Sequence, residues 1–77
     1  MKDLIKTIAQ ALVDDPSQVD VTEIKARQTL ILELRVAKED VGKVIGKKGR
    51  SAQAMRVVLS CASAKNNERA ILEIVEP

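Results

Sequence analysis

The chain has 77 residues, which is the length of one small domain covering residues 1–77. It contains a single cysteine and no histidine, so disulfide bonds and the common metal sites are nearly excluded as a means of stabilising it. The net charge is only +2, yet residues 41–50 contain four basic residues and no acid, which indicates one anionic partner at one place.

The N-terminus, MKDLIKTIAQALVDDP, predicts neither a signal peptide nor a membrane span. Its apolar residues are interrupted by Asp3, Lys6 and Gln10, and nowhere does the chain contain about 20 consecutive apolar residues. Together with a lone cysteine, this favours a soluble, cytoplasmic protein.

The first half of the chain predicts a helix followed by an antiparallel hairpin. Apolar residues at helical spacing indicate a helix over about residues 2–13, which Pro16 follows. From Val19 to about Ala26 and from Leu30 to Val36, apolar and polar residues alternate, as in strands. The segment KARQ, residues 25–28, is expected to connect them.

The second half predicts two helices and a last strand. A short helix is expected over about residues 39–45 and ends at Gly46, and a longer helix runs from about Arg50 to Ala64. The segment KNNE, residues 65–68, is typical of a turn, and AILEIV, residues 70–75, of a strand. The predicted order αββααβ describes an α+β domain.

The corner between these two helices is the predicted functional site. It reads Gly46, Lys47, Lys48, Gly49, and the chain's three glycines all lie within residues 41–50. Gly46 can end a helix with a positive φ, and a backbone without Cβ atoms lets another molecule approach closely. Backbone amides, a helix N-terminus and two ammonium groups suit a phosphate backbone. The P-loop and dinucleotide-binding spacings are not matched.

Residues 44–56, VIGKKGRSAQAMR, resemble the core signature of the KH domain, and the element order resembles its type II form. The whole chain is similar to the small bacterial single-domain KH proteins of the KhpA type. That resemblance implies a three-stranded mixed sheet packed on three helices. It also implies single-stranded RNA binding without catalysis or a cofactor, in post-transcriptional regulation or as an RNA chaperone, often with a larger KhpB-type KH protein as partner.

By position, the resemblance assigns RNA-binding roles to nine residues. Gly46, Lys47, Lys48 and Gly49 would clamp the backbone, Val44 and Ile45 would line an apolar groove under the bases, Arg50 and Arg56 would flank the strand, and Lys43 would extend the positive track. The chain has no Phe, Tyr or Trp, so aromatic stacking is excluded and weak binding is expected. A backbone clamp also leaves single-stranded DNA open as a ligand.

The helix after the loop has a second apolar side, formed by Ala54, Val57, Cys61 and Ala64. Either this helix is buried deeply between the sheet and the first helix, or this side packs on another chain as a dimer interface. The resemblance favours a homodimer or a heterodimer with a KhpB-type protein. An alternative function is therefore a protein-interaction subunit whose RNA binding depends on the assembled complex.

An enzyme is not indicated. Cys61 has no histidine to activate it, and it is expected to be a small buried hydrophobe. Asp14 and Asp15 precede a proline turn, while Glu39 and Asp40 are expected in the first turn of a helix, where acids are favoured by the dipole. Neither pair is interpreted as an acid/base dyad.

Overall fold

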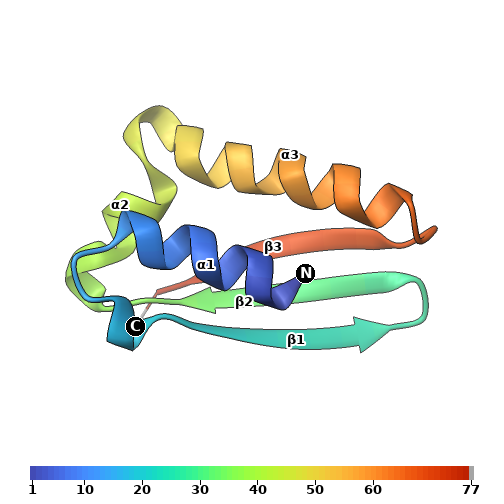
Figure 1. Ribbon diagram of the computed structural model, residues 1–77, viewed down its shortest axis with the longest axis horizontal. Coiled ribbons are helices and arrows are strands. Elements are labelled where there is room, and N and C mark those ends of the chain that lie inside the picture. Colours follow the sequence, from blue (N-terminus) through green and yellow to red (C-terminus); the bar gives the residue numbers. More distant parts are fainter. Residues whose placement is uncertain (77) are drawn as a thin grey trace.

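A computed structural model describes residues 1–76 and has the predicted order αββααβ (Figure 1). The elements are α1 (Lys2–Leu12), β1 (Asp20–Ala26), β2 (Thr29–Arg35), α2 (Val41–Ile45), α3 (Arg50–Ala64) and β3 (Arg69–Val75). Three short 3-10 turns at Pro16–Gln18, Lys38–Asp40 and Lys47–Gly49 join them. The α+β class and the boundaries of the helices agree closely with the sequence prediction.

The three strands form one mixed sheet in the order β1-β2-β3. β1 and β2 pair antiparallel, whereas β2 and β3 pair parallel. The hairpin is tighter than predicted, because Lys25 pairs with Leu30 and Ala26 with Thr29, which leaves only Arg27 and Gln28 in the turn. The expected four-residue connection was therefore too long. Lys25 is polar and Ala26 is small, so neither continues the alternation of large apolar and polar residues that identifies a strand.

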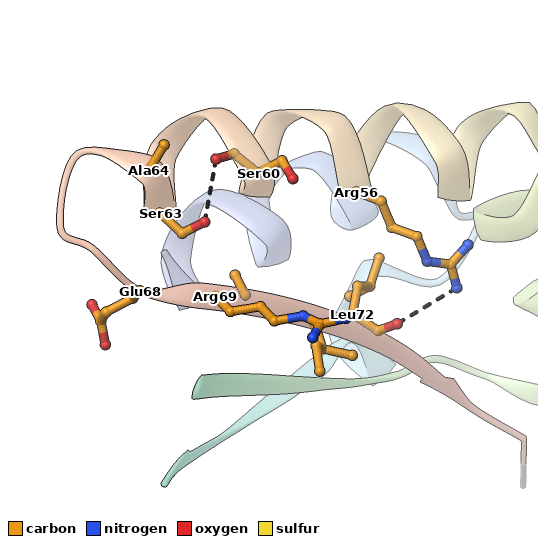
Figure 2. A pocket seen from close by; sticks show the side chains of 9 residues that line it. Arg56, Ser60, Ser63, Ala64, Glu68, Arg69 and Leu72 are labelled. Carbon is orange, nitrogen blue, oxygen red and sulfur yellow. Dashed lines mark hydrogen bonds between the residues drawn. The ribbon is translucent and has the colours of Figure 1, made fainter. Parts of the chain in front are cut away.

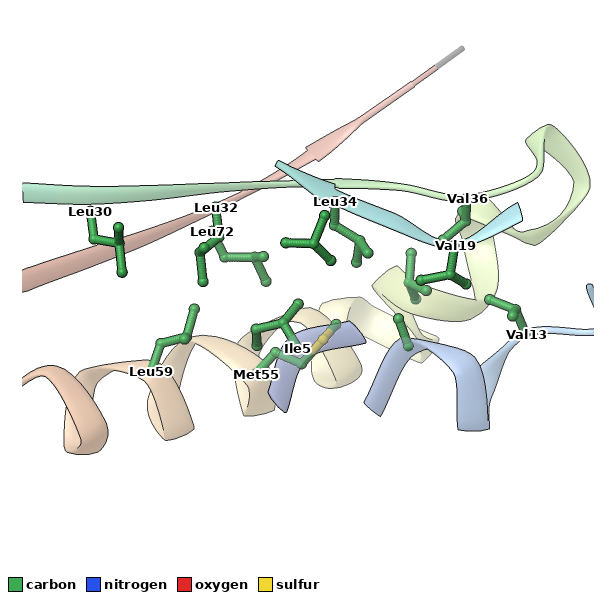
Figure 3. Close-up of a cluster of buried hydrophobic side chains, with 13 residues drawn as sticks. Ile5, Val13, Val19, Leu30, Leu32, Leu34, Val36, Met55, Leu59 and Leu72 are labelled. Atoms are coloured by element: carbon green, nitrogen blue, oxygen red, sulfur yellow. The ribbon is translucent and has the colours of Figure 1, made fainter. Parts of the chain in front are cut away.

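The helices cover one face of the sheet, and the hydrophobic core lies between the two layers (Figure 3). Ile5 and Ala9 of α1 are fully buried, as are Leu32 and Leu34 of β2. Met55 and Leu59 project from α3 onto the same core, as Figure 3 shows. The period-two and helical spacings thus each place one apolar side inward.

The second apolar side of α3 is not buried within the chain. Ala54, Val57, Cys61 and Ala64 are all exposed, Val57 by 52%. The deeply buried helix is therefore ruled out, and the expectation that Cys61 is buried is wrong for the single chain. Ser63 of the same helix is buried, and its hydroxyl donates a hydrogen bond to the carbonyl of Ser60 at 3.2 Å.

Candidate nucleic-acid interface

The loop between α2 and α3 is a compact corner at one end of the molecule (Figure 1). α2 ends at Gly46, whose φ of 79° and ψ of 170° belong to a region used almost only by glycine. One 3-10 turn follows, in which the Gly49 N–H donates to the Gly46 carbonyl at 3.0 Å. Gly49, with a φ of 73°, then begins α3 directly. The chain therefore turns twice within four residues.

The two glycines differ in their surroundings. A Cβ on Gly46 would lie 2.8 Å from the backbone nitrogen of Ser51 and would also overlap its side chain. A Cβ on Gly49 would meet nothing within 4 Å. Gly46 is thus required to build the corner, whereas the space over Gly49 is open to another molecule.

The positive charge at this corner comes from three exposed side chains, those of Lys47, Lys48 and Arg50. None of them takes part in the ion pairs found within residues 1–76. Lys48 has a φ of 58°, an uncommon value for a residue with a side chain. The corner therefore presents uncompensated ammonium and guanidinium groups beside accessible backbone.

The sequence prediction assigned Lys43 to the same positive track, but in the structure its side chain pairs with two carboxylates. Its ammonium group lies 2.7 Å from Oδ2 of Asp14 and 3.3 Å from Oδ1 of Asp40. The hydrogen bond to Asp14, together with that to Asp40, raises the pKa of Lys43 above its ordinary value. Two carboxylates already pair with this lysine, which sets it apart from the unpaired basic side chains of the loop.

Asp40 joins two segments that are distant in the sequence. Its side chain is buried. Its carboxylate oxygens accept hydrogen bonds from the backbone N–H groups of Asp14, at 3.3 Å, and Asp15, at 3.1 Å. Burial raises the pKa of Asp40, but the hydrogen bonds from Asp15, Asp14 and Lys43 outweigh it and hold the pKa below its ordinary value. An ionised Asp40 thus fixes the start of α2 to the chain after α1. It lies at the helix start as expected, but its role is this long-range contact.

The apolar groove expected at Val44 and Ile45 needs correction. Val44 is fully buried in the core, so it supports α2 from below and cannot contact a ligand. Ile45 is half-buried beside the loop. Consecutive side chains on a helix point in different directions, so Val44 and Ile45 cannot both face the same groove. Val44 packs in the core.

The open groove lies instead between α3 and β3 (Figure 2). Arg56 reaches down from α3, and its Nη2 donates to the carbonyl of Leu72 at 3.5 Å, while Arg69 lies along β3. We call this hollow of about 430 Å³ the α3–β3 groove. It is lined by Arg56, Ser60, Ser63, Ala64, Glu68, Arg69, Ala70, Ile71 and Leu72.

The sequence interpretation placed Arg56 beside the path of the RNA and assigned no role to Ser60 or Arg69, which line the same groove. Arg69 comes directly before the last predicted strand, and the signal that identifies it is structural. β3 pairs only with β2 and is an edge strand, so its other side faces α3 across the groove. The sequence does not reveal which strand forms that edge.

Taken together, these features can hold an extended anionic chain. The loop provides backbone and positive charge, and the α3–β3 groove provides two guanidinium groups and a mixed polar and apolar lining. Among residues 1–76, no group of three or more His, Cys, Asp and Glu side chains could hold a metal ion. No helix in that range is long and apolar enough to cross a membrane.

Comparisons with known proteins point to one family. A family model described as "KhpA/KhpB, KH domain" matches residues 2–74. The chain is 53% identical over 75 residues to the RNA-binding protein KhpA of Clostridium acetobutylicum, with 97% of this chain and all of the relative covered. It is 55% identical to that of Caldanaerobacter subterraneus at the same coverage. The KhpA of Aquifex aeolicus is 45% identical, covering 99% of this chain and 96% of the relative. No solved structure matches significantly.

Proposed function

The chain belongs to the KhpA/KhpB family of KH domains, and from this premise we propose that it binds single-stranded RNA through the Gly46–Gly49 loop. The observation that carries the proposal is the corner itself. Two positive-φ glycines bend the backbone tightly, and open space lies over Gly49 beside uncompensated lysines. A sugar-phosphate chain can rest there on peptide groups, with Lys47 and Lys48 against its phosphates.

From the loop, the RNA continues past Arg50 and Arg56 into the α3–β3 groove. Its bases contact the aliphatic side chains and the exposed edge of β3, because the chain offers no aromatic ring for stacking. Without stacking, which contributes about 1–3 kcal/mol per base, a single domain binds weakly. Single-stranded DNA is the alternative ligand, since a backbone clamp reads the 2′-hydroxyl poorly. The protein acts by binding rather than catalysis, in the cytoplasm, on transcripts.

The proposal is tested by replacing Lys47 and Lys48 together with Asp. Binding of single-stranded RNA should be abolished, because two attractive charges become repulsive at the phosphate contacts. Four basic contacts in the parent, from Lys47, Lys48, Arg50 and Arg56, give a log–log salt dependence of roughly −3. Fluorescence anisotropy at several salt concentrations measures both quantities, and circular dichroism verifies that the variant is folded.

A matched control carries the same change of charge elsewhere. Lys2 and Lys38 are also exposed, and their joint replacement by Asp should leave most of the affinity intact. A folded Lys47/Lys48 variant that binds RNA as tightly as the parent would refute the clamp. Crosslinking of bound RNA from cells, compared between parent and variant, identifies the transcripts.

A second function, assembly with another KH chain, is favoured by the exposed side of α3. Ala54, Val57, Cys61 and Ala64 lie there, and an apolar hollow between α1 and α3 adjoins them. We propose a second copy of this chain as the occupant, with a KhpB-type protein as the heteromeric alternative. Small side chains allow close approach of helices, and burial would help a marginal core. Sedimentation at tens of micromolar distinguishes dimer from monomer.

A further inference from the structure

The α3–β3 groove does not end where β3 begins. A second hollow, of about 550 Å³, adjoins it at the end of the molecule opposite the Gly46–Gly49 loop. We call it the hairpin-end hollow, and it is lined by Gln28, Thr29, Ala64, Asn67, Glu68 and Arg69. Three of these residues, Ala64, Glu68 and Arg69, also line the α3–β3 groove. The two hollows therefore form one continuous path.

Backbone and side-chain contacts hold this end of the molecule together, at the hairpin turn and at the turn between α3 and β3. The Arg69 N–H donates to the carbonyl of Gln28 at 2.7 Å, and the Glu68 N–H donates to that of Ser63 at 3.1 Å. The Lys25 ammonium group lies 3.5 Å from Oε2 of Glu68. The hairpin tip and the α3–β3 turn are thus fixed relative to each other, and the hollow between them is preformed.

The hairpin-end hollow has a polar lining and a positive surrounding. Two side-chain amides, those of Gln28 and Asn67, offer hydrogen-bond donors and acceptors together. Arg69 lines the hollow, and Arg27 and Lys65, both exposed, come from the same two turns. The one acid in its lining, Glu68, is paired with Lys25. Such a site matches a nucleotide, with its base edge on the amides and its phosphate near the guanidinium groups.

We propose that the hairpin-end hollow binds additional nucleotides of the same RNA, so that the bound segment is longer than the roughly four nucleotides of a single KH groove. The proposal rests on the proposed function, because the RNA reaches the hollow from the loop through the α3–β3 groove. Arg69 lines both hollows, whereas Arg27 contributes to affinity only when the RNA is long enough to extend past Arg56 and Ser60.

The test crosses RNA length with two variants at the hollow. One is Gln28→Ala with Asn67→Gly, because Asn67 has a φ of 56° that glycine tolerates and the Gln28 carbonyl remains in place. The other is Arg27→Ala. Gln53→Ala, exposed on α3 and outside both hollows, is the matched control. Affinities for a tetramer and an octamer of mixed sequence are measured by anisotropy, after circular dichroism has verified folding.

Each hollow variant should weaken octamer binding about fivefold, as expected for loss of a hydrogen bond or ion contact, while tetramer binding stays unchanged. Arg27→Ala should also make the octamer salt slope shallower by about 0.7. An octamer offers about five registers to a four-nucleotide site, so its tighter binding to the parent alone proves nothing. We therefore compare the ratio of octamer affinity to tetramer affinity in each hollow variant with the same ratio in Gln53→Ala. The number of registers is the same in both, so it cancels.

Equal effects of the hollow variants on both lengths, or no effect on either, would overturn the longer site while leaving the loop clamp intact. The Lys47/Lys48 double variant tests the clamp independently, since it should lose both RNAs. If that variant bound both RNAs like the parent, the proposed function would fail, and the longer site with it, because the path from the loop would not exist.

Discussion

At the scale of single residues, Gly46 and Gly49 place different demands on the loop. Gly46 adopts a backbone conformation that other residues avoid, and its missing Cβ leaves room for Ser51. Gly49 is left-handed as well, but it has open space where a side chain would be. The first glycine is needed for folding, and the second keeps a surface clear.

Alanine substitution at each glycine should therefore have a different result. Gly46→Ala should cost about 3 kcal/mol or more of unfolding free energy, because backbone strain and overlap with Ser51 add together. Gly49→Ala should cost about 1 kcal/mol, remain folded and weaken RNA binding, because its methyl group occupies the space of the ligand backbone. Urea denaturation and anisotropy measure the two effects. Equal stability losses would contradict this division of roles.

The residue scale is also where the sequence was least informative. The bends at Gly46 and Gly49 were predictable, because glycines between two helical patterns have few other uses. The pairing of Lys43 with Asp14 was not, since 29 residues separate them and only the folded chain brings them together. The burial of Val44 was missed for a related reason. Helical spacing identifies an apolar side chain but not the layer it faces.

At the scale of elements, Asp40 stabilises the position of α2 against the connection that follows α1. α2 has only five residues, too few to be stable alone, so its position depends on tertiary contacts. Val44 anchors it to the core, and Asp40 binds two backbone N–H groups and Lys43 at its start. Because α2 carries the loop directly, these contacts also place the loop.

Asp40→Asn should lower the melting temperature at pH 7 by about 5 °C or more, because a neutral amide replaces the charged acceptor. The pKa of Asp40 is below its ordinary value of 3.8 in the folded chain, so its contribution is complete above about pH 4. It is lost as the pH falls through the lower folded pKa. The difference between parent and variant should therefore shrink below pH 4.

Thermal unfolding between pH 2.5 and pH 7 measures this dependence. Glu39→Gln is the matched control, since Glu39 is exposed, directly precedes Asp40 and loses the same charge. The prediction fails if the melting temperatures of the parent and Asp40→Asn differ by the same amount at pH 7 and at pH 2.5. The ionised carboxylate would then not be the stabilising species.

Elements as a whole were largely predictable. Alternating apolar residues indicated β2 and much of β1, and helical spacing indicated all three helices, because each pattern matches one period. The sequence could not indicate that β3 lies at the edge of the sheet beside α3, because strand order depends on packing of distant segments. The α3–β3 groove and the position of Arg69 in it were missed for the same reason.

At the scale of the whole molecule, the helices of this 77-residue chain cover one face of its sheet (Figure 1). Those helices leave apolar side chains exposed. Leu4 and Leu12 of α1 are 41% and 37% exposed, and Val57 and Val58 of α3 are more than a third exposed. A small domain buries a low fraction of its surface, so a second copy packed on α3 would add burial that one chain lacks.

If a second copy binds there, folding and association are linked, and stability depends on concentration. The melting temperature of the parent should rise by about 5 °C over a hundredfold increase in concentration. Val57→Glu should abolish this rise and sediment as a monomer, because it places a charge in the interface. Val57 is exposed in the single chain, so the substitution should cost the monomer only about 0.5 kcal/mol or less.

Gln53→Glu adds the same charge on the polar side of α3 and should behave like the parent. A parent that sediments as a monomer at tens of micromolar and melts at one temperature throughout would exclude the homodimer. RNA affinity separates the two functions further. If Val57→Glu binds an RNA tetramer as tightly as the parent, each chain's loop acts independently, and assembly only adds a second clamp to the same strand. If the affinity falls with dissociation, RNA binding belongs to the assembled complex.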